Sequence, residues 1–264
     1  MGKKFRTEAP DLLREVHWSS SSGPRLPIVC FADPAPCSKR APLLDGYAAM
    51  RLLERFPTDP TSRADGFCFS AAMHTLIGDI VEHVSELAHI RPEQVLVGVT
   101  RARNQRPGGL YARIVPMRFA GGCLTTQRRG QVWHMQRFWL DECEILYLLH
   151  FFLPRYGHLD FEEKLVTVFH ELYHISPEFN GDLRRWDGPC VLHGRSIMAY
   201  DRRMLGLARD YVRLTGGAPA AWFLRLSWAQ LCAAGGTVWG YCPPLPKLLP
   251  CQAGVDRPGL SGTR

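Results

Sequence analysis

The sequence lacks the features of a secreted disulfide scaffold and of a membrane protein. Its nine cysteines are an odd, scattered set without a C-x-x-C pair, whereas secreted scaffolds use even numbers at regular spacings. The longest apolar run, residues 145–153, is too short to span a bilayer. The N-terminus has neither the apolar core of a signal peptide nor a myristoylation pattern. We therefore expect a protein of the reduced cytoplasmic compartment.

Both ends of the chain are poor in the patterns of regular structure. The 20 prolines and 24 glycines are dense before residue 66 and after residue 215, and such segments cannot bury enough apolar surface to order themselves. We expect a partly disordered, Pro/Ser-rich extension over residues 1–65, with one helix at 43–56. A compact domain over residues 66–215 follows. A C-terminal extension over 216–264 then carries one helix near 219–234 and a flexible tail.

The central domain alternates between helical and strand patterns. Apolar residues at helical spacing predict helices over residues 71–90, 160–175 and 195–214, the second beginning with a capping box of Asp160 and Glu163. Residues 95–100 and 145–153 read as strands, the latter buried on both faces because it is apolar throughout. Residues 111–119 contain Pro116, which indicates an edge strand or a bulge.

The helix predicted over residues 160–175 carries His170-Glu171-x-x-His174. Residues four apart lie on one helical face, so both imidazoles can bind one metal ion, and zinc is the metal that this spacing indicates. Glu171 follows the first histidine and can act as general base on a water that the metal activates. The alternative is a pair of helical histidines without a metal.

The third zinc ligand can be narrowed by elimination. Metzincins place a glycine and a third histidine shortly after the pair, but Pro177 and Asn180 stand at those positions. Thermolysin-like enzymes use a glutamate from the next helix, and no glutamate follows Glu178. His193 is the only histidine after His174, which makes it the preferred third ligand. The alternatives that stay open are Glu178, Asp182 and Cys190.

The supporting residues of such a site are less specific. A group that stabilises the oxyanion is needed, and the candidates near the motif are Tyr173, Tyr200 and Arg195. For each of these three, ordinary packing or surface charge is the favoured interpretation. Asp182 and Asp201 are candidates for orienting the histidines.

The residues around the motif resemble the phage-type metallopeptidase family of phages and bacteria. The likeness covers residues 67–215 and rests on residues 170–177, 179–185, His193-Gly194, Tyr200-Asp201 and the upstream segment 109–116. It implies an α+β, zincin-like domain with a small mixed sheet, a backing helix, the active-site helix and a following helix that carries the third ligand. The implied ligands are His170, His174 and His193, and the implied catalyst is Glu171.

Three functions compete at this point. The first is a zinc-dependent peptidase whose edge strand, near residues 111–119, binds an extended protein or peptide substrate. The second is a nucleic-acid-associated protein, because the histidine-glycine arrangement is also similar to SprT-like proteases that act on DNA-bound proteins. The net charge of +7 agrees with it, and its contact face would use Arg101, Arg103, Arg106 and the arginines of the helix at 195–214. The third is a non-catalytic, zinc-stabilised interaction module.

Overall fold

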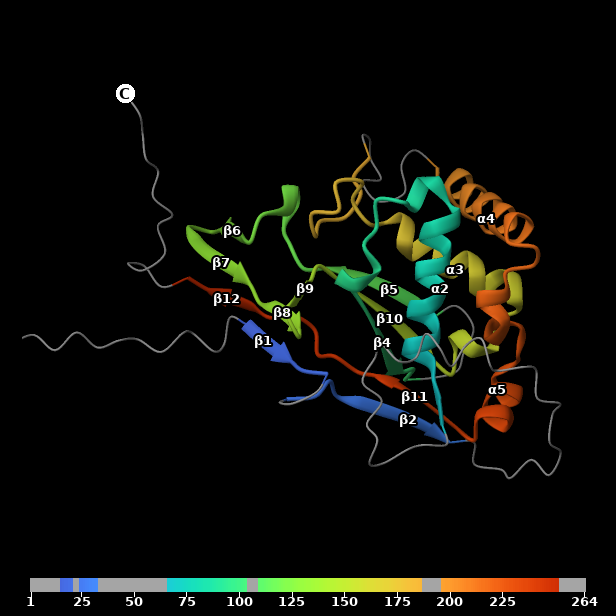
Figure 1. The fold of residues 1–264 in the computed structure, drawn as a ribbon. Helices are drawn as coiled ribbons and strands as arrows, with labels where there is room; N and C mark the ends of the chain where they lie inside the picture. The colour runs from blue at the N-terminus through green and yellow to red at the C-terminus, as the bar shows by residue number, and fades with distance from the viewer. Residues whose placement is uncertain (1–14, 21–23, 33–65, 104–108, 187–195, 252–264) are drawn as a thin grey trace, which may run out of the picture.

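The centre of the molecule is a three-stranded mixed sheet (Figure 1). The computed structural model describes residues 15–20, 24–32, 66–103, 109–186 and 196–251. Strand β10 (Tyr147–Leu153) lies between β4 (Val95–Arg101), to which it is parallel, and β5 (Ala112–Pro116), to which it is antiparallel. The helix predicted for residues 43–56 lies outside the described residues. The edge position predicted for the strand with Pro116 is confirmed.

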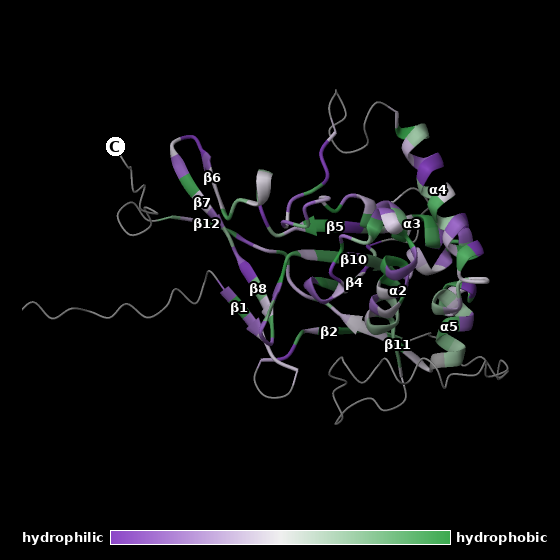
Figure 2. Cartoon of the chain, turned by 45° about the horizontal axis from the view of Figure 1, so that its top comes forward, coloured by the Kyte–Doolittle hydropathy of each residue, from purple (hydrophilic) through white to green (hydrophobic). Residues whose placement is uncertain are grey.

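Strand β10 is buried on both faces, as its continuous apolar sequence predicts. Tyr147, Leu149 and Phe151 point into the main core against the helices. Leu148 points to the other face, into a second apolar cluster that includes Phe138. Figure 2 shows the hydrophobic residues gathered on this sheet and the helices against it. This double burial fixes the register of the central strand, since a one-residue slip would exchange its two faces.

Helices cover one face of the central sheet. Helix α2 (Phe69–His83) packs on β4, α3 (Phe161–Tyr173) packs against β5, and α4 (Ile197–Leu214) packs on α3. Helix α2 ends earlier than the predicted residue 90, because Val84 takes an extended backbone with φ −117° and ψ 103°. The predicted helix near residues 219–234 is a 3₁₀ helix, η6 (Pro219–Arg225), followed by the short α5 (Trp228–Gly235).

Three smaller sheets surround this centre, and they join distant parts of the chain. The first sheet has the order β1 (Glu15–Trp18), β8 (Arg137–Leu140) and β9 (Cys143–Ile145). The second has the order β2 (Ile28–Ala32), β11 (Thr237–Tyr241) and β3 (Gly66–Cys68). The third has the order β12 (Leu248–Pro250), β7 (Gln131–Met135) and β6 (Thr125–Arg128). Strand pairing therefore runs across both predicted domain boundaries, and β12 lies in the segment predicted as a flexible tail.

The remaining regular structure consists of single 3₁₀ turns: η2 (Ser85–Leu87), η3 (Pro92–Gln94), η4 (Ala120–Gly122) and η5 (Tyr156–His158). No disulfide joins any two of the seven cysteines in the described ranges. Within those same ranges, no helix is long and apolar enough to cross a membrane. The architecture is α+β, as expected.

Candidate functional site

Helix α3 positions the His-Glu-x-x-His motif. It begins with the predicted capping box: the Asp160 carboxylate accepts the Glu163 N–H at 2.8 Å, and the Glu163 carboxylate accepts the Asp160 N–H at 3.0 Å. Such a cap satisfies two backbone donors that would otherwise lack partners. The last helical residue is Tyr173, so His174 stands at the C-cap rather than inside the helix. The motif thus lies in the final turn of a helix whose N-terminus is stabilised by a capping box.

The two histidines of the motif lie together. Their ring centroids are 4.8 Å apart with the ring planes at 79°. Two imidazoles on one tetrahedral zinc, with Zn–N bonds of about 2.0–2.1 Å, have ring centres about 5 Å apart. His174 is buried, while the His170 side chain is 28% exposed. The pair therefore has the separation that a shared metal ion requires, with one ring open to solvent.

Tyr200, on the facing helix α4, completes an aromatic cluster around this pair. Its ring stacks on His174 at 5.5 Å with an interplanar angle of 20° and meets the edge of His170 at 5.0 Å. Its hydroxyl donates to the His170 carbonyl at 3.2 Å. Burial raises the pKa of the Tyr200 hydroxyl well above its usual value, so it stays protonated and remains a donor. Of the three predicted oxyanion candidates, Tyr200 is the one whose ring contacts both histidines.

Glu171 is buried between α3 and the edge strand β5. Its side-chain oxygen Oε2 accepts the main-chain N–H of Ile114 at 2.7 Å. Burial raises the pKa of Glu171 to about 7, and the hydrogen bond from Ile114 opposes this rise. A carboxyl group with such a pKa can both accept and release a proton near neutral pH, which general acid–base chemistry needs.

Two alternatives for the third ligand are described, and neither approaches the histidine pair. Glu178 is bonded to the Ser176 hydroxyl. The Asp182 carboxylate is held by Arg185 at 2.8 and 3.0 Å and by the Gly121 N–H at 2.9 Å. Across the described residues, no three His, Cys, Asp or Glu side chains form a metal-binding group. The preferred ligand His193 and the alternative Cys190 lie outside those residues, as does Arg195.

The other described residues that were predicted to support the site are Asp201 and Tyr173. Asp201 Oδ1 lies 3.9 Å from His170 Nδ1, beyond hydrogen-bond distance. Tyr173 is buried, its ring contacts Trp186 and Tyr200, and the guanidinium groups of Arg184 and Arg203 lie 4.2 and 5.0 Å from its ring centroid. Tyr173 is therefore a packing residue of the loop after the helix.

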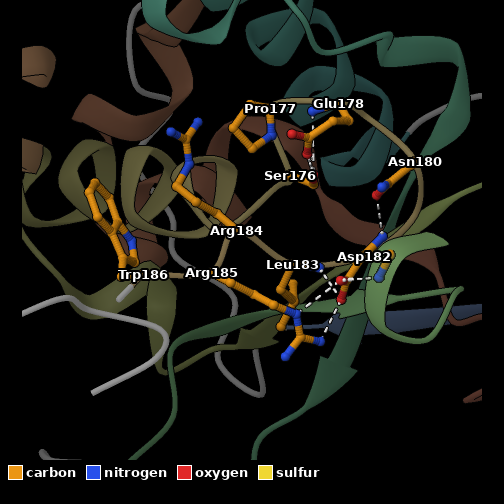
Figure 3. A pocket seen from close by; sticks show the side chains of 10 residues that line it. Ser176, Pro177, Glu178, Asn180, Asp182, Leu183, Arg184, Arg185 and Trp186 are labelled. Carbon is orange, nitrogen blue, oxygen red and sulfur yellow. Dashed lines mark hydrogen bonds and ion pairs between the residues drawn. The ribbon is translucent and has the colours of Figure 1, made fainter. Parts of the chain in front are cut away.

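The chain after His174 folds back over the end of α3. The Arg184 N–H donates to the His174 carbonyl at 2.7 Å, and Ile175 pairs with Leu183 in an isolated bridge. Beside this turn lies a pocket of about 420 Å³ (Figure 3). Its lining comprises Gly121, Ser176, Pro177, Glu178, Asn180, Asp182, Leu183, Arg184, Arg185 and Trp186. The residues that line the pocket do not include His170 or His174.

The arginines predicted to form a nucleic-acid face are partly engaged elsewhere. Arg101 donates to the Cys30 carbonyl at 2.8 Å and lies over the Phe31 ring. On α4, Arg209 pairs with Glu162 at 2.8 Å and Arg213 pairs with Asp210 at 3.0 Å. Arg106 lies outside the described residues. These contacts neutralise part of the charge that a phosphate-binding face would use.

The sequence did not predict that the Ile114 N–H would bind Glu171. The available signal was Pro116, which marks an edge strand, but nothing local indicated that this edge faces the motif. The two residues are 57 positions apart, so only the folded arrangement brings them together.

Comparison of the chain with protein-family models, with curated proteins and with solved structures finds no match.

Proposed function

We propose that this protein is a zinc-dependent peptidase of the zincin type. The observation that supports it most is the placement of Glu171. Glu171 follows the first of two histidines whose rings have a metal-compatible separation, and its buried carboxylate accepts a hydrogen bond from the main chain of an edge strand. Together these provide a metal position, a base and a surface for an extended peptide, which are the parts that peptide hydrolysis needs.

In this proposal His170, His174 and His193 hold the metal. When bound, zinc polarises the scissile carbonyl and lowers the pKa of water. Three protein ligands leave one position open, as a catalytic site requires. Described residues on both sides of the segment with His193 contact the pair: Arg184 through the His174 carbonyl and Tyr200 through both rings.

Glu171 acts as the general base and then as the general acid. It takes the proton of the attacking water and passes it to the leaving amine, for which a pKa of about 7 is suited. Tyr200, whose ring contacts both histidine rings, is the hydroxyl donor that we assign to the developing oxyanion. Rotation of its hydroxyl away from the His170 carbonyl would free it for this role.

The variant Glu171→Gln tests the mechanism. It keeps the size and the acceptor for the Ile114 N–H but cannot take a proton, so hydrolysis of a disordered protein such as casein should fall by at least about 100-fold. Zinc content, measured in parallel by atomic absorption, should stay equal to that of the wild type. A zinc-loaded variant that cleaves at the wild-type rate would refute the role of Glu171.

A further inference from the structure

The main chain of strand β5 alternates between groups that face β10 and groups that face outward. Phe152 donates to Tyr111 at 2.9 Å and Met117 donates to Leu146 at 3.0 Å, which fixes the odd-numbered residues as those bonded to β10. The backbone groups of Ala112, Ile114 and Pro116 consequently point away from the sheet. Proline at 116 costs no ladder bond, because the missing N–H would lie on the outer side.

Glu171 occupies a place on this outer side where a strand partner would bind. No strand within the described ranges pairs with the outer edge of β5. The Ile114 N–H instead donates to the Glu171 carboxylate at 2.7 Å. In an added strand, a main-chain carbonyl of the incoming peptide would accept this same N–H. The general base and the substrate therefore compete for the same hydrogen-bond donor, the Ile114 N–H.

We propose that the Ile114 N–H is a shared donor that couples substrate docking to release of the general base. An extended peptide that pairs with β5 takes the Ile114 N–H with a carbonyl and frees the Glu171 carboxylate to turn toward the histidine pair. One hydrogen bond is exchanged for another, and no covalent step is involved. This inference rests on the proposed function and adds that the substrate is recognised through its backbone, in extended form, at this position of β5.

The coupling has a physical consequence for the resting protein. Because the Glu171 side-chain oxygen accepts the Ile114 N–H at 2.7 Å, Glu171 stays on β5 until a peptide carbonyl competes for the donor. Water that enters the site without substrate then meets a base that is turned away from it. Removing the acceptor at residue 171 should open the edge strand and strengthen peptide binding.

The test compares casein binding by two variants that cannot catalyse. Glu171→Gln keeps an acceptor for the Ile114 N–H, whereas Glu171→Ala has none, and neither consumes the probe. We expect Glu171→Ala to bind casein roughly two- to tenfold more tightly, the range set by one net hydrogen bond. Placing Ile114→Pro on both backgrounds removes the donor and should abolish the difference. Ala112→Pro, at another outward position, should preserve it.

The outcomes separate this inference from the proposed function. Equal casein affinity of the Gln and Ala variants would overturn the shared donor, even if the wild type hydrolyses casein. A difference that persists with Ile114→Pro, or casein binding by neither variant, would overturn it as well. A wild type that hydrolyses nothing, combined with the expected affinity difference, would refute the proposed function and support the peptide-binding edge. Amide exchange at Ile114, faster in Glu171→Ala than in Glu171→Gln, checks the donor directly on the native strand.

Discussion

The groups around two buried residues, Glu171 and His150, set the pH at which each side chain is protonated. Glu171 and His150 are both buried side chains that titrate, and burial shifts the pKa of each toward its neutral form, to about 7 for Glu171 and about 4 for His150. Glu171 has a hydrogen-bond donor from the edge strand. Among the described residues, His150 has the Thr100 hydroxyl 3.3 Å from Nδ1 and the positive charge of Arg113 nearby. The first arrangement suits proton transfer, and both shifts make stability depend on pH, in opposite directions: as the pH falls below 7, protonation of Glu171 favours the folded state whereas protonation of His150 disfavours it.

His150 should make the protein sensitive to mild acid. Its pKa is lowered from 6.5 to about 4 in the folded state, by burial first and by Arg113 second. The folded state therefore binds fewer protons than the unfolded state between these values. The stability is complete above about pH 6.5 and is lost as the pH falls toward 4. From pH 7 to pH 5 the free energy of unfolding should fall by about 2 kcal/mol on this account.

Urea unfolding at pH 7, 6 and 5 measures this effect, with His150→Gln as the comparison. Glutamine is polar and similar in length to histidine but does not titrate. The variant should therefore lose stability less steeply between pH 7 and pH 5. The measured quantity is the change of the free energy of unfolding with pH, and not the absolute stability of the variant. Equal slopes for the two proteins would show that His150 is not the group responsible.

At the scale of elements, helix α3 is tied to the C-terminal segment by a buried lysine. Lys164 is 3% exposed, and its ammonium group donates to the carbonyls of Leu224 at 3.1 Å and Leu226 at 2.7 Å, at the end of η6. Replacing it by Met would leave both carbonyls without this donor. We expect Lys164→Met to lower the free energy of unfolding by about 1–3 kcal/mol.

Thermal or chemical unfolding of Lys164→Met checks this, and Arg213→Met is a matched control. Arg213 is also a cation in a described helix, but it is exposed and pairs only with Asp210, so its loss should change stability by less than about 0.5 kcal/mol. A similar small effect for both variants would show that the lysine does not hold η6 against α3.

Elements with strong local signals were predictable from the sequence, and those that depend on distant partners were not. The capping box at Asp160 and the apolar run of β10 lie within a few neighbouring residues, and both predictions were confirmed. The strands β2 and β11 are five residues each and pair with one another from opposite ends of the chain. The site divides in the same way: the spacing of the two histidines is local, whereas the bond between Ile114 and Glu171 is not.

For the whole molecule, the C-terminal extension behaves as part of the core. Phe223, Leu224, Leu231 and Val238 are buried in the main hydrophobic cluster, and β11 lies at the centre of its sheet. Removing one such large side chain costs about 2–5 kcal/mol. A chain ending at residue 215 should therefore lose cooperative unfolding, which circular dichroism with urea detects. A truncated chain with an unchanged transition would show that residues 66–215 fold independently.

Metal binding is the property that links the whole chain to the proposed chemistry. Two ligands on α3 are not sufficient for a catalytic zinc, which takes three protein ligands, so stoichiometric zinc requires a residue from another segment. We expect one zinc per wild-type chain and a strong loss of zinc in His193→Ala. Chelation should also lower the unfolding midpoint of the wild type, because a metal that binds only the folded state stabilises it.

The matched control for His193→Ala is His158→Ala, which changes a histidine at the end of η5 that the proposed site does not use. It should retain full zinc content. Unchanged zinc in His193→Ala would transfer the third-ligand role to another residue, with Cys190 next to test, since Glu178 and Asp182 are bonded elsewhere. Loss of zinc in His193→Ala, together with a wild-type unfolding midpoint that chelation leaves unchanged, would contradict the expected linkage, because a metal that binds only the folded state must stabilise it.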